Sequence, residues 1–455
     1  INEITLDNDY QKHLPSKTDD VYEAMRLRMG SNLPVSAFIN MPDGHFQADT
    51  SSFDKRGVAE TVPHYINSNC IMCNKCSLIC PHGVIRPFLL NEDEYQKAPD
   101  MVKDKCLKDS KGGYYCLGIS VLDCTGCGLC IKNCPGKKEQ KALVSSKLNV
   151  EITNKEQAIY DYLINNVKEK DVYKINTVKG SQFKESKFKF HGACAGCGQT
   201  AYIKLLTQLF GDDLIISNAT GCSSIYGASA PCMPYNIPWA SSLFEDNAEY
   251  GYGMLMANNV IKERLRSLMV KEKNPLCKEW LENIDNYQIT KKVYDHLDYK
   301  NVNKEINDLK DFLISRNIWI IGGDGWAYDI GFGGIDHVLS TNDKVKILVL
   351  DSEVYSNTGG QSSKATPKGS IASFSSMGKK TSKKNLAKYA LTLNHVYVGT
   401  INLGANANQA IKTLIEANEY NGPALIIAYT PCIAHGIKGG LENSIDMEAL
   451  ATNCG

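Results

Sequence analysis

From about Phe188 onward, short apolar runs alternate with stretches of helical periodicity and with glycine-rich turns. Apolar runs of five to seven residues are typical of strands that are buried on both faces. Their alternation with helices predicts a parallel sheet covered by helices, and we therefore expect an α/β domain over residues 188–455. The runs are DLIIS, NIWIIGGDG, VKILVLD, HVYVGT and ALIIAYT.

The earlier part of the chain has a different texture. Residues 1–60 are mostly loop with Pro and Gly, apart from one helical pattern near Val21–Met29, and are interpreted as a connector or part of a preceding domain. Residues 61–150 are dense in cysteine and form a second domain. Residues 151–187 are expected to be a linker that holds an amphipathic helix near Lys155–Glu169.

Length and charge narrow the possible classes of protein. A chain of 455 residues is long enough for two or three domains. Lys plus Arg and Asp plus Glu balance at 50 each, so no net charge argues for nucleic acid or for a membrane surface. No apolar run is long enough to span a bilayer and no signal pattern is visible, so a cytoplasmic location is expected. The first residue is Ile1, and we expect a piece of a longer protein, whose organelle-targeting segment, if any, would lie outside it.

Two cysteine runs share one unusual spacing. CIMCNKCSLICP and CTGCGLCIKNCP are both C-x2-C-x2-C-x3-C-P, the spacing with which bacterial ferredoxins bind two [4Fe–4S] clusters. In that arrangement the fourth cysteine of each run ligates the other cluster. Structural zinc is the alternative, but zinc sites use two well-separated C-x2-C pairs. The predicted ligand sets are Cys70, Cys73, Cys76 and Cys134 for one cluster, and Cys124, Cys127, Cys130 and Cys80 for the other.

The remaining cysteines form no run of this kind. Cys106 and Cys116 lie between the two runs and are interpreted as ordinary thiols. Cys194 and Cys197 lie in a glycine-rich loop, whereas Cys222 and Cys432 each follow a predicted strand. Because strand ends converge at one edge of a parallel sheet, these four thiols can meet. A third Fe–S cluster, a zinc site and separate buried thiols all stay open on spacing alone.

A glycine-rich turn and an oxygen-rich strand end suggest a phosphate site. Asp324 follows the strand of NIWIIGGDG, between Gly323 and Gly325, and Ser352, Asn357 and Thr358 follow the strand of VKILVLD. Mg²⁺ on a diphosphate needs such hard oxygen ligands, and glycines let backbone N–H groups approach phosphates. An ordinary turn is the alternative.

With these motifs in place, the sequence resembles the C-terminal portion of pyruvate:ferredoxin oxidoreductase, a family of thiamine-diphosphate enzymes. Nearly the whole chain takes part in the resemblance, and the signature blocks occur in the family's order. These blocks are CIMCNKCSLICPHGVIRP, LDCTGCGLC, GACAGCG, NATGCSSIYG, SLFEDNAEYGYGM, GGDGWAYDIGFGG and DSEVYSNTGGQ. The implied architecture is a thiamine-diphosphate-binding parallel-sheet domain preceded by a small α+β ferredoxin-like domain with two clusters.

The resemblance also implies roles for individual residues. Asp324, the Ser352 side chain and the Val354 carbonyl would hold Mg²⁺ on the diphosphate, and Asn357 would face the substrate. Cys194, Cys197, Cys222 and Cys432 would bind a third [4Fe–4S] cluster close to the thiazolium ring. Gln199 stands where the family usually has a glutamate. The positions expected to line the cofactor are Gln199, Cys222, Ser223, Gly323, Asp324, Gly325 and Thr358.

The implied reaction is the oxidative decarboxylation of pyruvate with coenzyme A to acetyl-CoA and CO₂. Single electrons would pass through three clusters to ferredoxin or flavodoxin. The expected enzyme is a homodimer whose N-terminal domains, outside this chain, complete the active site. Rival interpretations are the core of a pyruvate:NADP⁺ oxidoreductase, an enzyme for another 2-oxoacid, and a pure electron-transfer protein without an organic cofactor.

Two further features receive expectations. The segment Ser362–Asn385 concentrates lysines without an acid and is interpreted as a solvated basic loop, with attraction of coenzyme A phosphates or an acidic ferredoxin as a hypothesis. His191 and His435 lie close to cysteines of the third set, and supporting roles are favoured over ligation.

Overall fold

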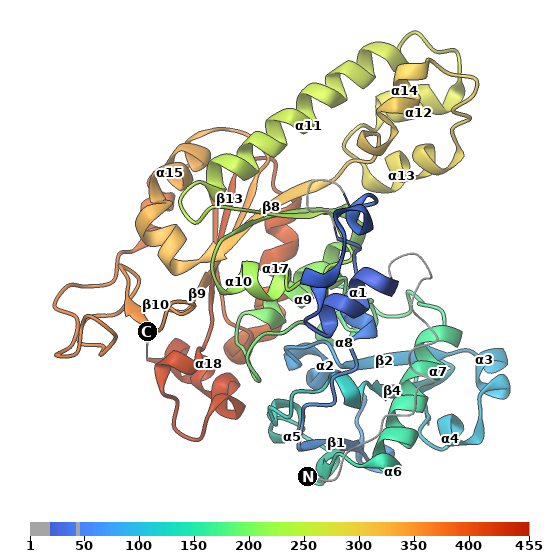
Figure 1. The fold of residues 1–455 in the computed structure, drawn as a ribbon, viewed down its shortest axis with the longest axis vertical. Coiled ribbons are helices and arrows are strands. Elements are labelled where there is room, and N and C mark those ends of the chain that lie inside the picture. The colour runs from blue at the N-terminus through green and yellow to red at the C-terminus, as the bar shows by residue number, and fades with distance from the viewer. Residues whose placement is uncertain (1–18, 42–45, 455) are drawn as a thin grey trace.

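The computed structural model describes residues 19–41 and 46–454, and its centre is a six-stranded parallel sheet (Figure 1). Strand order is β12-β13-β9-β8-β6-β7. Five of the strands coincide with the five apolar runs, which confirms that prediction. Their bounds are β6 Leu214–Ala219, β8 Asn317–Gly323, β9 Lys346–Asp351, β12 Tyr397–Ile401 and β13 Ala424–Tyr429. The sixth, β7 (Trp239–Ser242), is an edge strand.

Helices cover both faces of the sheet, as burial of both faces requires. Apolar side chains of α9 (Thr200–Phe210) and α17 (Leu403–Glu419) form the core on one face. The opposite face is covered by α11 (Asn247–Met269), α15 (Phe332–Ser340) and α16 (Leu386–Leu391). The carboxyl ends of the strands are thereby left to the connecting loops, which carry the predicted cofactor residues.

Beyond the sheet, α11 extends into a small helical unit with a core of its own around Trp280 (Figure 1). The sequence patterns did not predict this unit. Its other helices are α12 (Pro275–Glu282), α13 (Tyr287–His296) and α14 (Lys304–Asp308), followed by the short helix η10 (Lys310–Phe312).

The cysteine-rich segment forms a separate α/β layer below the sheet in Figure 1. β1 (Thr61–Tyr65) pairs antiparallel with β5 (Leu143–Lys147). The first strand precedes the first cysteine run and the second strand follows the second run, so one two-stranded ribbon joins the two ends of the segment. Two short helices, α2 (Lys75–Ile79) and α5 (Leu129–Lys132), lie within the runs. The insertion between the runs supplies β2 (Ile85–Leu90), β3 (Leu107–Lys108) and β4 (Tyr114–Ile119) as an antiparallel sheet, with α3 (Glu92–Lys97) and α4 (Asp100–Lys103).

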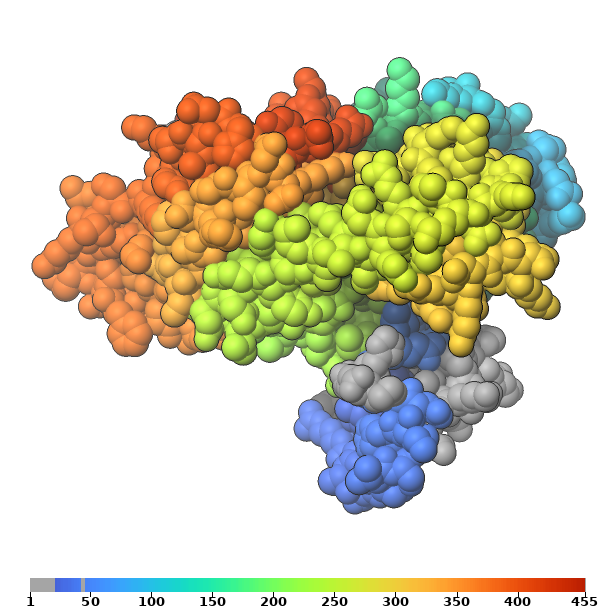
Figure 2. All heavy atoms as spheres, turned by 90° about the horizontal axis from the view of Figure 1, so that it is seen from above, coloured from blue at the N-terminus to red at the C-terminus, as the bar shows by residue number. Residues whose placement is uncertain are grey.

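A helical segment joins the two parts. α6 (Val150–Ile152), a π-helical turn (Thr153–Gln157) and α7 (Ala158–Asn166) follow one another where the amphipathic helix was predicted. A loop then leads through α8 (Val178–Ser181) to the large domain. At the N-terminal side, α1 (Asp19–Arg26) and the residues after it project from the body (Figure 2). None of the helices in the described ranges has an apolar stretch long enough to cross a membrane.

Candidate functional site

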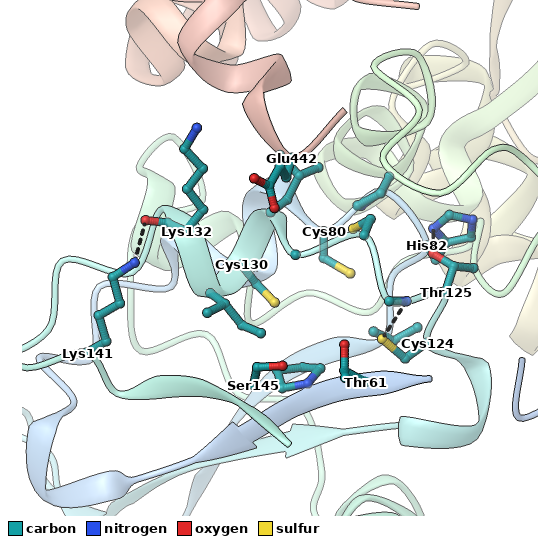
Figure 3. Close-up of a pocket in the computed structure, with 18 residues that line it drawn as sticks. Thr61, Cys80, His82, Cys124, Thr125, Cys130, Lys132, Lys141, Ser145 and Glu442 are labelled. Atoms are coloured by element: carbon teal, nitrogen blue, oxygen red, sulfur yellow. Dashed lines mark hydrogen bonds between the residues drawn. The ribbon is translucent and has the colours of Figure 1, made fainter. Parts of the chain in front are cut away.

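The two cysteine runs surround two separate cavities, and each cavity is lined by one of the crossed sets of four. Cys70, Cys73, Cys76 and Cys134 line a small cavity, together with Tyr65 and Tyr115. Cys80, Cys124, Cys127 and Cys130 line a larger one of about 440 Å³. Figure 3 shows the sulfur atoms of Cys80, Cys124 and Cys130 facing this common space. The structure therefore groups these thiols as the ferredoxin spacing predicts, with the fourth cysteine of each run in the other set.

Burial disfavours the thiolate form of several of these cysteines. Burial, followed by the neighbouring thiols, raises the pKa of Cys76 and Cys130 well above its ordinary value. Burial likewise raises the pKa of Cys124 to about 12 and of Cys127 to about 11. Four buried or half-buried thiols around one cavity form an unfavourable site for negative charge unless bound iron neutralises it.

The number of thiols around each cavity matches the ligand set of a cluster. In the described part of the chain, no three His, Cys, Asp or Glu side chains converge closely enough to hold one metal ion. Thiolates on a [4Fe–4S] cube bind different irons and so stand farther apart than the ligands of one tetrahedral zinc. Each cavity is lined by four cysteines, which is the ligand number of a [4Fe–4S] cluster, so the residues present fit a cubane in each cavity.

The third set of cysteines meets at the carboxyl edge of the parallel sheet. Cys222 begins α10 (Cys222–Gly227), three residues after β6, and Cys432 follows β13. Cys197 interacts with Cys194 and Cys432, and Cys222 interacts with all three. Burial is the largest cause that raises the pKa of Cys197 and of Cys222 to about 12. The loop and the two strand ends thus bring together the four thiols whose role was left undecided by their spacing in the sequence.

A cavity of about 420 Å³ lies beside this third set, at the ends of β6, β8 and β9. Cys222 lines it, so the cavity and the third cysteine set share a residue. Every residue predicted to hold thiamine diphosphate, Mg²⁺ or substrate contributes to its wall. These residues are Gln199, Cys222, Ser223, Gly323, Asp324, Gly325, Ser352, Val354, Asn357 and Thr358.

The predicted Mg²⁺ ligands form one hydrogen-bonded group. The Ser352 hydroxyl lies 3.1 Å from Oδ1 of Asp324 and 3.3 Å from the Val354 carbonyl oxygen. The Ser363 hydroxyl donates to the other carboxyl oxygen of Asp324 at 2.6 Å. A carboxylate, a hydroxyl and a carbonyl oxygen within reach of one another are the hard ligands that Mg²⁺ prefers in a phosphate site.

The charges around Asp324 also favour a bound cation. Asp324 is 1% exposed, and burial together with the nearby Asp351 raises its pKa to about 7. A buried carboxylate beside a second buried carboxylate is costly unless a cation compensates it. Glycines leave room for a ligand: a Cβ atom placed on Gly221 or Gly323 would meet nothing within 4 Å. The donor set and the open backbone therefore fit a magnesium diphosphate.

Comparison with known proteins agrees with this geometry. Residues 311–428 match the family model described as thiamine pyrophosphate enzyme, C-terminal TPP binding domain, and residues 5–59 match one described as a domain of unknown function. The pyruvate:ferredoxin oxidoreductase of Moorella thermoacetica is 45% identical over 454 residues, which cover 93% of this chain and 38% of that protein. The chain is a homologue of the C-terminal portion of the pyruvate:ferredoxin oxidoreductases.

The names of the relatives specify different electron acceptors. The pyruvate-flavodoxin oxidoreductase of Klebsiella pneumoniae is 42% identical, with 95% of this chain and 38% of that protein covered. The mitochondrial pyruvate dehydrogenase [NADP(+)] of Euglena gracilis is 40% identical, with 98% and 26% covered. The chain thus spans less than half the length of these pyruvate oxidoreductases.

Several residues of the site were missed by sequence reasoning. Ser363 contacts Asp324 from a segment that was interpreted only as a basic loop. Tyr328 and Lys383 both contact Asp351, at 2.8 Å and 2.7 Å. The lysines did carry a signal, namely their density in the sequence, but that density predicted a solvated basic loop and did not indicate partners within the chain.

The expectation of a solvated basic loop is wrong for three of its lysines. Lys379 donates to the carbonyl oxygens of Ser363 and Thr366, and Lys384 donates to that of Tyr328. Lys383 forms ion pairs with Asp351 and Glu353. The segment around residues 362–385 projects at one end of the molecule (Figures 1 and 2), but these three cations contact neighbouring parts of the same domain.

The remaining predicted residues have identifiable partners. Gln199 is buried and accepts a hydrogen bond from the Tyr226 hydroxyl at 3.1 Å. His435 accepts a hydrogen bond from the Cys432 amide at Nδ1 and donates to the Ser352 carbonyl oxygen at 2.6 Å. Cys106 donates to the Val102 carbonyl and lies in a hydrophobic core apart from all three cysteine sets.

Proposed function

We propose that this chain is the part of a pyruvate:ferredoxin or pyruvate-flavodoxin oxidoreductase that binds thiamine diphosphate, Mg²⁺ and three [4Fe–4S] clusters. Residues 61–150 would be a ferredoxin-like domain with two clusters, and residues 188–455 the thiamine-diphosphate domain with the third. Residues 151–187 would link them, and residues 1–60 would belong to a preceding domain. The homology to enzymes of that name supports this assignment.

One observation carries the proposal: Cys222 belongs both to the third cysteine set and to the wall of the thiamine cavity. A cluster held by that set would therefore lie directly beside the bound cofactor. A protein that only carried electrons would need no such cavity, and a thiamine enzyme that did not release electrons would need no thiols at its edge.

Contacts between the two parts support an order for the proposed clusters. The thiol of Cys127 accepts a hydrogen bond from the amide of Gly196, which lies between Cys194 and Cys197. The set of Cys80, Cys124, Cys127 and Cys130 thus lies next to the third set. We infer that this set holds the middle cluster, and that the set of Cys70 holds the one farthest from the thiamine cavity.

Thiamine diphosphate, when bound, would supply the electron sink for loss of CO₂ from a 2-oxoacid. Asp324, the Ser352 hydroxyl and the Val354 carbonyl would hold Mg²⁺ on its diphosphate, and glycine backbone would face the phosphates. Asn357 would orient the substrate. Gln199 is uncharged, so a carboxylate at this position is not part of the proposed chemistry.

The reaction would convert pyruvate and coenzyme A to acetyl-CoA and CO₂, with ferredoxin or flavodoxin as the acceptor and with the active site completed by segments outside this chain. A dimeric enzyme in the cytoplasm is part of the proposal. Reduction of NADP⁺ is the second candidate, because the Euglena relative is named for it.

The test is to determine iron, acid-labile sulfide and thiamine diphosphate in the anaerobically purified enzyme that contains this chain. Three cubanes predict about 12 irons per chain. About eight irons, or zinc at Cys194 and Cys432, would contradict the third cluster. Pyruvate-dependent reduction of ferredoxin, flavodoxin and NADP⁺, measured side by side, would identify the acceptor.

A further inference from the structure

Two buried histidines lie between the middle cysteine set and the third one. His82 follows Cys80 by two residues and lines the cavity of the middle set (Figure 3). His191 precedes Cys194 by three residues. Both side chains are 2% exposed, and their rings stack with centroids 4.5 Å apart and an interplanar angle of 27°. Neither belongs to the thiamine cavity or to a cysteine set.

Each histidine donates a hydrogen bond to a backbone carbonyl oxygen in the loop of the other histidine. In both cases the accepting residue is adjacent to a cysteine of that loop. Nε2 of His191 donates to the carbonyl oxygen of Pro81, which directly follows Cys80, at 2.7 Å. Nε2 of His82 donates to the carbonyl oxygen of Ala193, which directly precedes Cys194, at 3.1 Å. The two bonds run in opposite directions between the same two loops. Together they tie the loop of the third cysteine set to that of the middle set.

The partners at the other ring nitrogens fix the tautomers. A carbonyl oxygen only accepts, so Nε2 carries the proton in both rings. Nδ1 of His191 then accepts from the Ala193 amide at 3.3 Å, and Nδ1 of His82 faces the Thr125 hydroxyl at 3.3 Å. As neutral imidazoles, both rings have a hydrogen-bond partner at each of their two nitrogens, so neither ring has a free nitrogen to ligate iron.

Packing holds the pair in place on the thiamine side. Phe188 stacks on His191 with centroids 4.7 Å apart, and Tyr226 lies tilted against the same ring at 5.6 Å. The Tyr226 hydroxyl donates to Gln199, which lines the thiamine cavity. A continuous series of contacts therefore runs from the thiamine cavity through His191 and His82 to the cavity of the middle cysteine set.

We propose that the His82–His191 pair is a clamp that fixes the separation between the third and the middle cluster, and so sets the rate of electron transfer between them. This inference rests on the proposed function. Electron transfer rates fall steeply with distance, and the two loops belong to different domains. The pair adds to the hydrogen bond between Gly196 and the Cys127 thiol, and the two links together limit how far domain motion can change the separation. Both histidines are positioning residues, because they act through the loops and not on the reacting atoms.

The crossed hydrogen bonds and the ring stack can be separated by substitution. Phenylalanine at position 82 or 191 keeps a planar ring of similar size but removes the donor. Glutamine keeps a donor within reach of the carbonyl oxygen but removes the stacked ring. His395→Phe is the matched control, because His395 also lies between two backbone carbonyl oxygens, of Leu393 and Thr341, just before the amino end of β12.

The experiment uses the anaerobic holoenzyme and measures three quantities. These are iron per chain, the magnetic spin–spin interaction between reduced clusters by electron paramagnetic resonance, and the rate at which clusters become reduced after pyruvate is added without acceptor. We expect His82→Phe and His191→Phe to alter the spin–spin interaction and to slow the transfer by about tenfold or more, as is typical for residues that orient metal ligands. The glutamine variants and His395→Phe should behave like the wild type.

The outcomes separate the two proposals. A wild-type enzyme without clusters would end the proposed function and this inference with it. Phenylalanine variants that retain full iron, normal spin–spin interaction and normal rate would overturn the clamp alone. If the phenylalanine variants lose iron, the glutamine variants decide: restored iron and normal coupling support the donor clamp, whereas equal loss in both series refutes it.

Discussion

Lys383 Nζ lies 2.7 Å from the Asp351 carboxylate, which is 2% exposed. The same carboxylate accepts a hydrogen bond from the Tyr328 hydroxyl at 2.8 Å. Asp351 is also the charged neighbour that, after burial, raises the pKa of Asp324 to about 7. Lys383 therefore compensates the negative charge of Asp351, the acid whose charge acts on the candidate Mg²⁺ ligand Asp324. Lys383 lies 32 positions after Asp351 in the sequence.

Replacement of Lys383 by Met should leave Asp351 buried without its cation. We expect the free energy of unfolding of the metal-free protein to fall by about 2 kcal/mol, since a buried acceptor that loses its partner keeps its desolvation cost. A double variant, Lys383→Met with Asp351→Asn, should recover most of this loss. Chemical denaturation measures both. Lys380→Met, at an exposed position of the same segment, is the control, and an equal loss there would contradict the internal role of Lys383.

Asp324→Asn should abolish most of the Mg²⁺-dependent binding of thiamine diphosphate. The carboxylate supplies the only negative charge among the three proposed ligands, and we expect the affinity to fall by about 100-fold or more. Titration calorimetry with thiamine diphosphate, with and without Mg²⁺, measures the change. Asp329→Asn is a suitable control, because Asp329 contacts Lys364 and does not line the cavity. Unchanged Mg²⁺ dependence in Asp324→Asn would refute the assigned ligand.

The parallel sheet could be predicted because buried strands leave a direct mark on the sequence. β9 is buried at every position and β13 at all but its last, so both read as continuous apolar runs. β7 was not predicted from the sequence because it is a short edge strand without a fully buried residue. The helical unit around Trp280 was missed because it carries no motif, and its helices bury their apolar side chains only against one another.

The cysteine sets were predictable for a different reason. The first three cysteines of each run are close in sequence, and the ferredoxin spacing is one in which the fourth cysteine joins the other set, so the two runs together specify which thiols meet. Contacts between distant segments leave no such pattern. His82 reaches Ala193 across 111 positions, and Lys383 reaches Asp351 across 32. Nothing local to either residue indicates its partner, and only the folded chain shows it.

Glu448 gives a dependence on pH that is separate from the cofactors. This residue of α18 (Ser444–Asn453) is buried, and its carboxyl accepts a hydrogen bond from the Gly404 amide at the start of α17 at 2.6 Å. Burial raises its pKa from 4.5 to about 8. The folded protein therefore favours the protonated acid. As the pH rises from about 4.5 to 8, the unfolded chain releases this proton first, and stability is lost.

Glu448→Gln cannot ionise and still offers an oxygen to the Gly404 amide. We expect the variant to match the wild type near pH 4.5 and to become more stable than it as the pH rises to 8, by up to about 4 kcal/mol. Thermal unfolding at a series of pH values measures the difference. Glu416→Gln, at a partly exposed position of α17, should show no such trend. A difference that is flat with pH would mean that Glu448 ionises normally in the folded state.

Tyr65 provides a test of the cluster farthest from the thiamine cavity. Its side chain is 1% exposed and lines the cavity of Cys70, Cys73, Cys76 and Cys134. Apart from an interaction with the Cys70 thiol, its hydroxyl finds no hydrogen-bond partner among the described residues. A buried hydroxyl of this kind costs stability in the cluster-free protein, but can donate to a thiolate once a cluster is bound.

Tyr65→Phe should therefore have opposite effects on the two forms. The cluster-free variant should be more stable than the wild type by about 1 kcal/mol, because it loses a buried hydroxyl whose one partner among the described residues is the weakly interacting Cys70 thiol. In the holoenzyme, the loss of a donor to sulfur should lower the reduction potential of this cluster and leave the other two unchanged, since hydrogen bonds to the ligating sulfurs favour the reduced, more negative state. Redox titration followed by electron paramagnetic resonance measures the potentials. Tyr114→Phe serves as the control, because the Tyr114 ring stacks on Tyr95 in a different core. Three unaltered potentials in Tyr65→Phe would show that its hydroxyl does not reach the cluster.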